Sequence, residues 1–111
     1  RLDGERLYVT EANSHVRAVD PDSGQTLWRQ DKLAHRKLTA PVPIPDTDYL
    51  IVGDYNGYVH ILTRADGRIV GRHRPGDSFG ILADAVAVDA NRVAIQTRGG
   101  QLSVLSIRAR Q

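Results

Sequence analysis

A repeat of 43 residues is the feature of this sequence that most constrains its fold. Residues 3–9 align position by position with residues 46–52, and these align with residues 89–95 at the same offset. The offset continues into the apolar runs that follow, at residues 16–19, 59–62 and 102–105. A period of about 40 to 50 residues is typical of solenoids, propellers and other arrays of one structural unit. The choice among these depends on what each repeat contains.

Each repeat contains short β-rich runs separated by turn dipeptides. Glycine in these pairs supplies the positive φ that tight hairpins require, and the pairs are Asp3-Gly4, Ser23-Gly24, Asn56-Gly57, Asp66-Gly67 and Gly99-Gly100. No window of helical length carries a sustained apolar stripe of helical period. Four antiparallel strands in 43 residues match the blade of a β-propeller. We therefore predict an all-β fold, a partial β-propeller of about two and a half four-stranded antiparallel blades.

The texture of individual runs supports this prediction. Residues 50–52 and 93–95 are apolar without alternation, which predicts strands buried on both faces. In the second repeat we expect strands at residues 39–45, 49–54, 58–63 and 68–74, the last polar enough to face water. The first repeat is predicted to lack its innermost strand and the third its outermost one, which gives ten strands in all. The blade units of this single propeller segment are residues 1–32, 33–76 and 77–111.

An arc of this length leaves two blade faces uncovered, because known propellers close with about four to eight blades. Repeat arrays usually shield such faces with capping units, and the sequence shows none. We therefore expect the chain to be the C-terminal part of a larger closed propeller, whose N-terminus supplies the missing outer strand. In isolation, the 111 residues are expected to self-associate or exchange strands through the uncovered faces.

One turn has a more specific pattern than the repeat itself. It contains Ala18, Asp20, Ser23, Gly24 and Trp28 in the spacing A-x-D-x-x-[ST]-G-x-x-x-W. Asp20 can accept hydrogen bonds from the backbone of the turn, and Gly24 can adopt the left-handed conformation that ends it. We expect the Trp28 ring to cover the seam between two blades. The pattern resembles the tryptophan-docking motif of quinoprotein-type (PQQ-like) propeller repeats.

The other repeats keep only part of this motif. Gly67 lies 43 residues after Gly24, but Gly71 stands where the second repeat would carry its tryptophan. Gly57 and Gly100 are related by the same offset. We predict that these glycines, like the motif around Trp28, have structural roles.

Two further segments resemble the BamB family. Residues 33–42 contain His-Arg followed by Leu-Thr-Ala-Pro-Val, and residues 49–60 contain Leu-Ile-Val-Gly-Asp followed by Gly-Tyr-Val-His. The resemblance covers essentially the whole chain and is most specific over residues 33–62. Ile61 is a departure, since the family often has tryptophan there.

The resemblance implies a function for the parent protein. It would be an eight-bladed propeller lipoprotein on the periplasmic face of the Gram-negative outer membrane, held by a lipid anchor upstream of this chain. It would be a non-catalytic scaffold of the BAM complex, which folds and inserts outer-membrane β-barrel proteins. It would bind the POTRA domains of BamA and could also touch unfolded client proteins. The family's BamA-contacting loops lie upstream of the matched region, so no partner-binding residue is assigned here.

Signals for catalysis, metals or cofactors are weak. The chain has no cysteine, and His15, His35, His60 and His73 show no ligand spacing. Residues 20–24 begin like a calcium loop but lack its remaining acidic positions. We therefore predict no catalytic residue, no metal and no cofactor. Basic residues alternate with acidic ones along the chain, which argues against nucleic-acid binding.

Other functions remain open at this stage. A PQQ-dependent dehydrogenase would share these repeats, although it would need a quinone site and a calcium ligand set. An unrelated propeller could be a platform for proteins or glycans. Tyr55 and Tyr58, on either side of the Asn56-Gly57 turn, could contact a partner or pack as a hairpin pair. The sequence does not decide between these roles, or what His60 does.

Overall fold

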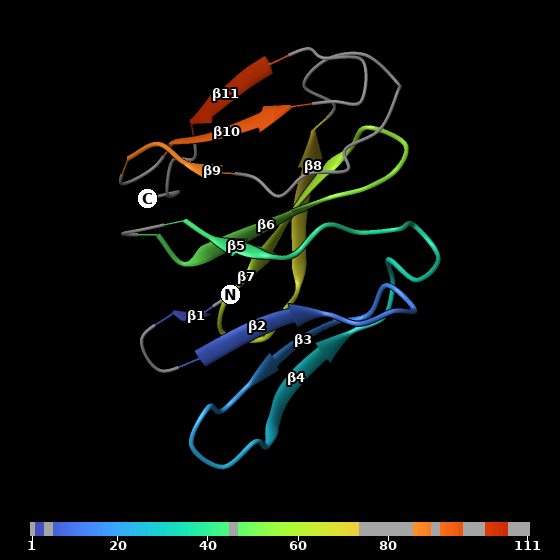
Figure 1. The fold of residues 1–111 in the computed structure, drawn as a ribbon, viewed down its shortest axis with the longest axis vertical. Helices are drawn as coiled ribbons and strands as arrows, with labels where there is room; N and C mark the ends of the chain where they lie inside the picture. The colour runs from blue at the N-terminus through green and yellow to red at the C-terminus, as the bar shows by residue number, and fades with distance from the viewer. Residues whose placement is uncertain are drawn as a thin grey trace.

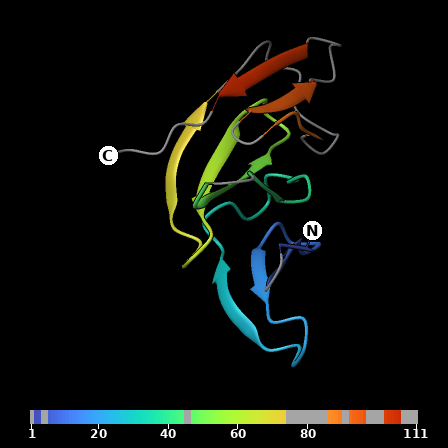
Figure 2. The ribbon, with the colours of Figure 1, turned by 90° about the vertical axis from the view of Figure 1, so that its left-hand side faces the viewer.

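The computed structural model describes residues 2–3, 6–44, 47–73, 86–89, 92–96 and 102–106. These residues form eleven β-strands in three antiparallel sheets. The sheets lie one above another in chain order (Figure 1) and follow a curve when the molecule is turned (Figure 2). None of the described residues belongs to a helix that could cross a membrane. The chain is thus all-β and has the blade-by-blade stacking of a partial propeller.

The first sheet has four strands rather than the predicted three. They are β1 (Leu2–Asp3), β2 (Arg6–Thr10), β3 (Val16–Val19) and β4 (Thr26–Gln30), hydrogen-bonded in that order. The prediction that this repeat lacks its innermost strand is therefore wrong, because Leu2–Asp3 pairs antiparallel with β2. A strand of two residues is too short to show the alternation by which strands are predicted from sequence.

The second sheet also has four strands. They are β5 (Val42–Pro43), β6 (Tyr49–Gly53), β7 (Val59–Thr63) and β8 (Ile69–His73), again in chain order. The three longer strands confirm their predicted positions to within one residue at each end. The predicted inner strand at residues 39–45 is correct in place but pairs over only two residues.

The prolines of the inner strand β5 lie where they do not interrupt its pairing with β6. The Ile44 N–H donates to the Tyr49 carbonyl (3.1 Å), so at this position the backbone faces β6. In an antiparallel ladder, alternate residues direct their backbone groups to opposite sides. Pro41 and Pro43 therefore occupy the positions that face away from β6, where a missing N–H costs no ladder bond. The free edge of β5 offers few donors to an added strand.

The third sheet has three strands in the described part of the chain. They are β9 (Val86–Ala87), β10 (Arg92–Gln96) and β11 (Leu102–Ser106), in the order β11-β10-β9. With β1, the described residues form eleven strands in place of the predicted ten.

The 43-residue repeat is also visible in the irregularities of the sheets. The register between β3 and β4 shifts between Ala18 and Val19. The register between β7 and β8 shifts between Ile61 and Leu62, at the equivalent position. A bulge increases the local twist of a strand pair, so the first two blades bend at the same place.

Two apolar layers hold the blades together. The layer between the first two sheets consists of Tyr8, Val16, Ala18, Trp28, Leu33, Leu50, Val52 and Leu62. The layer between the second and third consists of Val42, Ile44, Ile51, Val59, Val93 and Ile95. Strand β6 contributes to both layers, with Leu50 and Val52 on one side and Ile51 on the other. This explains why its sequence does not alternate, because both of its faces are buried.

Candidate functional site

Three loops meet at one edge of the first two blades. They are residues 11–15 between β2 and β3, residues 31–41 between β4 and β5, and residues 54–58 between β6 and β7, all on the right in Figure 1. We call this set of loops the loop edge. The His35 N–H donates to the Asn13 carbonyl (3.3 Å), and the Tyr55 N–H donates to the Arg36 carbonyl (3.0 Å). The middle loop is thereby tied to both of its neighbours.

The backbone of the loop edge is strained. Among the described residues, the non-glycine residues with positive φ are Ser14 (66°), His35 (66°) and Lys37 (53°), and all three lie here. Such conformations persist only where the surrounding structure imposes them, and they cluster at functional sites. The sequence gives no direct sign of this, since none of the three is glycine or asparagine.

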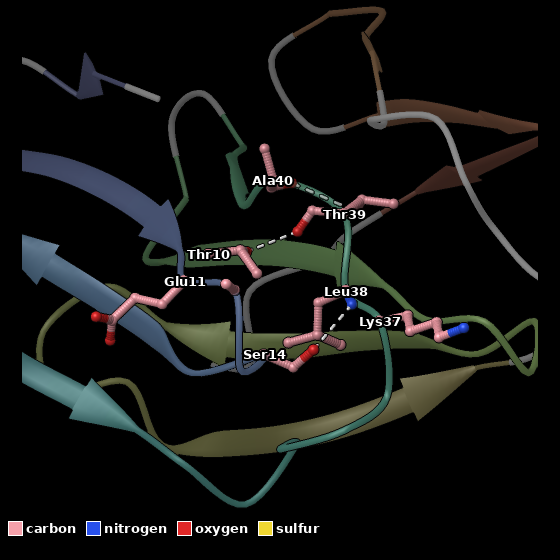
Figure 3. Close-up of a pocket in the computed structure, with 8 residues that line it drawn as sticks. Thr10, Glu11, Ser14, Lys37, Leu38, Thr39 and Ala40 are labelled. Atoms are coloured by element: carbon pink, nitrogen blue, oxygen red, sulfur yellow. Dashed lines mark hydrogen bonds between the residues drawn. The ribbon is translucent and has the colours of Figure 1, made fainter.

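A cleft of about 490 Å³ opens between the first two loops. It is lined by Thr10, Glu11, Ala12, Ser14, Lys37, Leu38, Thr39 and Ala40 (Figure 3). The Thr10 hydroxyl donates to the Thr39 carbonyl (2.7 Å), and the Leu38 N–H donates to Ser14 Oγ (3.4 Å). The cleft walls therefore carry hydroxyl oxygens with unused acceptor capacity.

A buried carboxylate organises the third loop. Asp54 is fully buried, and its side chain accepts hydrogen bonds from His60 Nε2 (2.7 Å), the Asn56 N–H (2.9 Å) and the Tyr58 N–H (3.0 Å). Arg36 Nη1 lies 3.5 Å from the same carboxylate. Burial raises the pKa of Asp54, but the hydrogen bonds from His60 and the turn outweigh it, so the pKa lies below its ordinary value of 3.8.

His60 therefore has a structural partner in this chain. Its side chain is buried on β7, facing the turn that Asp54 begins. Sequence reasoning left the role of His60 open and did not identify Asp54 or Arg36. The available signal was the spacing of an aspartate, a glycine and a histidine across a predicted hairpin turn.

Two cations rest on the tyrosines of the loop edge. Lys37 Nζ lies 5.1 Å from the centre of the Tyr55 ring, and Arg72 Cζ lies 4.9 Å from that of Tyr58. Tyr55 is 40% exposed. Each contact is an attraction between a cation and the face of an aromatic ring. The arrangement can bind anionic or polar groups.

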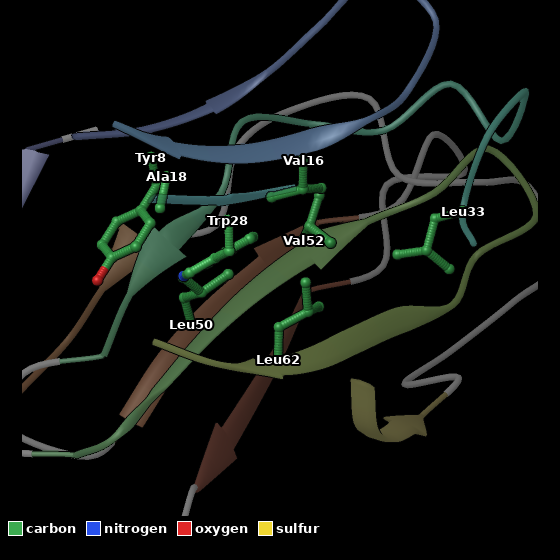
Figure 4. Packing of buried hydrophobic residues seen from close by; sticks show 8 residues of the cluster. All are labelled: Tyr8, Val16, Ala18, Trp28, Leu33, Leu50, Val52 and Leu62. Carbon is green, nitrogen blue, oxygen red and sulfur yellow. The ribbon is translucent and has the colours of Figure 1, made fainter. Parts of the chain in front are cut away.

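The structure also gathers most of the tryptophan motif, on the seam between the first two blades. Trp28 is 9% exposed, and its Nε1 donates to the Arg64 carbonyl (2.8 Å) of the second blade. The ring lies on Gly67, where an added Cβ would be 2.3 Å from Trp28 Cε3. Tyr8 packs beside it at 6.0 Å between ring centres (Figure 4). Ala18 is buried opposite Trp28 in the ladder.

The turns that carry the motif have the same backbone geometry in both blades. Gly24 and Gly67 have φ of 74° and 75°, and their N–H groups donate to the Asp20 and Thr63 carbonyls at 2.8 and 3.0 Å. The side chain of Asp20 accepts the Asp22 N–H (2.9 Å).

Among the described residues, the others predicted to have structural roles lie in separate places and do not join the Trp28 contact. Ser23 Oγ accepts the Gln25 N–H (3.2 Å). Gly57 has φ of 91° in the 54–58 loop, away from the seam. Gly100 lies outside the described residues. At Gly71, an added Cβ would meet only Ile61 Cδ1 at 3.8 Å.

Within the described residues, no group of three His, Cys, Asp or Glu side chains could hold a metal ion. Stacked antiparallel sheets of three or four strands, a period of 43 residues and a tryptophan docked on the next blade define a segment of a PQQ-like β-propeller. The sequence model of one family, described as outer membrane protein assembly factor BamB, matches residues 12–110. The chain belongs to this family.

Individual relatives agree with that assignment. The outer membrane protein assembly factor BamB of Shewanella oneidensis is 36% identical over 104 residues, which are 94% of this chain and 25% of the relative. That of Escherichia coli is 40% identical over 99 residues, 89% of this chain and 24% of the relative. The chain therefore spans about a quarter of the length of these relatives.

Solved structures show the same fold. The crystal structure of BamB from Moraxella catarrhalis matches 96% of this chain and 30% of its own, with a TM-score of 0.82 and 28% identity. The computationally designed protein Ika4 matches 97% of this chain and 64% of its own, with a TM-score of 0.74 and 16% identity. The second likeness concerns the fold alone.

Proposed function

We propose that this chain is a structural segment of a non-catalytic scaffold subunit in outer-membrane protein assembly. The observation that carries the proposal is the match of nearly the whole chain to a family whose members are named outer membrane protein assembly factor BamB. The docked tryptophan and the two apolar layers support a mechanical role, since they join consecutive blades into one body.

The parent protein, in this proposal, is an eight-bladed propeller on the periplasmic face of the outer membrane. A lipid anchor upstream of the chain holds it there. It belongs to the BAM complex and binds the POTRA domains of BamA, with unfolded outer-membrane proteins as possible clients. Function is geometric in such a scaffold: rigid blades present loops at fixed positions, and binding needs no reaction at any of them.

Loops are better suited than the inner strand edges to meet a partner. Addition of a partner strand requires backbone donors along an exposed edge. In the second blade, Pro41 and Pro43 remove donors from the free edge of β5. The loop edge, by contrast, presents side chains of varied chemistry on a backbone fixed by hydrogen bonds.

The test is association of the purified full-length protein with the POTRA domains of BamA, measured by sedimentation velocity. We expect a complex of defined stoichiometry, and absence of any complex would contradict the proposed partner. The same preparation is assayed for quinone absorbance and for calcium-dependent reduction of a dye acceptor. A positive result there would overturn the scaffold proposal in favour of a PQQ-dependent dehydrogenase.

A further inference from the structure

We propose that the loop edge is a docking surface for an extended, acidic segment of a partner protein. The proposal goes beyond the scaffold function above and needs no BamA contact, because it rests on residues of this chain alone. It combines three observations: strained loops tied together, cations held on tyrosine rings, and an adjacent polar cleft.

The cations supply the attraction for carboxylates. Lys37 and Arg72 are both exposed, and within the described part of the chain neither lies within ion-pair distance of a carboxylate. Arg36 differs, because its charge is offset by the buried Asp54. Among the described residues, no carboxylate neutralises these two cations, and each is oriented by the ring beneath it.

The tyrosines favour an acidic peptide over a small inorganic anion as the ligand. Tyrosine offers a large rigid contact surface with a polar end, and it is enriched in protein interfaces. Tyr55 is exposed on the loop edge, beside the Lys37 ammonium. An extended chain can place a carboxylate on this ammonium while an adjacent aliphatic group covers the ring.

The cleft extends the surface towards the first blade. Lys37 is one of the residues that line the cleft, so the cleft adjoins the cation that rests on Tyr55. The half-buried Thr10 donates its hydroxyl hydrogen to the Thr39 carbonyl and keeps its lone pairs for an incoming N–H. This acceptor suits the backbone of an extended peptide.

The backbone strain indicates that the surface is held in one conformation. His35 and Lys37 have positive φ on either side of Arg36, and the Arg36 carbonyl accepts the Tyr55 N–H. This alternation directs Arg36 towards the buried Asp54, while His35 and Lys37 remain exposed. A surface fixed before binding loses less conformational entropy when a partner arrives.

The test uses the full-length protein and an acetylated peptide of alternating glutamate and serine, followed by fluorescence anisotropy at low and physiological ionic strength. We expect salt-sensitive binding that the glutamine–serine counterpart does not show. Lys37→Gln and Arg72→Gln should each weaken binding by about two- to fivefold, the range for loss of one exposed ion pair. Arg68→Gln, which removes the same charge from the turn before β8, should leave binding unchanged.

Mapping of the bound peptide makes the test specific to this surface. Amide chemical shifts should change in residues 35–37 and 54–58. Equal binding of both peptides, no binding, or equal losses for Arg68→Gln and Lys37→Gln would overturn the proposal. So would binding to phosphatidylglycerol vesicles that Lys37→Gln and Arg72→Gln weaken while the acidic peptide does not bind, because the surface would then recognise lipid headgroups.

Discussion

Residues with positive φ serve two different purposes in this chain. At Gly24 and Gly67 the left-handed conformation ends a turn at almost no steric cost, and the sequence signals it. At His35 and Lys37 the same region of φ is occupied by residues with side chains, which costs about 1 kcal/mol or more each. The first group builds the blades, and the second shapes the loop edge.

The two turn glycines provide a matched test of tryptophan docking. Gly24→Ala meets no atom within 4 Å, so it should lose only the cost of the left-handed backbone, about 1–2 kcal/mol of unfolding free energy. Gly67→Ala adds a clash with the Trp28 ring and should cost about 1–3 kcal/mol more. Urea denaturation of both variants measures the difference. Equal losses would show that Trp28 does not rest on Gly67 in solution.

Lys37→Gly should stabilise the fold while removing the cation from the loop edge. Relief of the positive φ outweighs the added entropy of the unfolded chain, and we expect a gain of about 0.5 kcal/mol in unfolding free energy. Lys32→Gly is the control, because Lys32 lies in the same connection without positive φ and should lose stability. A loss of stability in both variants would contradict the strained conformation.

The environment of Asp54 predicts that the stability of the fold decreases at acid pH. Its pKa is lower when folded than the ordinary 3.8, because hydrogen bonds outweigh burial. The stability it contributes is thus present above the ordinary value and is lost as pH falls through the folded pKa. Asp54→Asn should lower the free energy of unfolding at neutral pH by about 1–3 kcal/mol. The variant should also lose less of its remaining stability than the parent as the pH falls below about 4. Asp48→Asn, at an exposed carboxylate, is the control, and an unchanged decline in Asp54→Asn would contradict this role.

At the scale of strands, burial on both faces separates β6 from the outermost strand β8. Leu50, Ile51 and Val52 are each at most 1% exposed, whereas β8 is half-buried or exposed throughout. The repeat and its non-alternating runs were sufficient to predict this arrangement. The sequence did not reveal β1, which pairs over two residues, or the loop edge, whose side chains meet only through tertiary contacts.

Hydrogen exchange of the full-length protein tests whether β6 is more protected than β8. Amides of β6 should exchange more slowly than those of β8, because β6 is paired on both sides and lies between two apolar layers. Mass spectrometry of peptides covering residues 49–53 and 69–73 gives the comparison. Equal protection of the two strands would contradict the stacking of blades described here.

For the whole molecule, the repeat predicts what covers the third sheet. Val59 on the second sheet is 1% exposed beneath the third, whereas its equivalent Leu102 is 67% exposed and Val104 is 53% exposed. Exposed apolar residues at a repeat position that is buried between the first blades indicate an interblade surface that lacks its neighbouring blade. We propose that a further blade of the parent propeller covers it, as expected from the open arc.

Thiol labelling measures this most directly, because the chain has no cysteine of its own. Leu102→Cys and Val59→Cys are each labelled in the full-length protein and in the isolated 111 residues, and the modified peptides are quantified by mass spectrometry. Cys at position 59 should be protected in both. Cys at position 102 should react readily in the isolated chain, apart from any self-association, and be protected in the full-length protein. Rapid labelling at position 102 in the full-length protein would contradict a closed propeller of stacked blades.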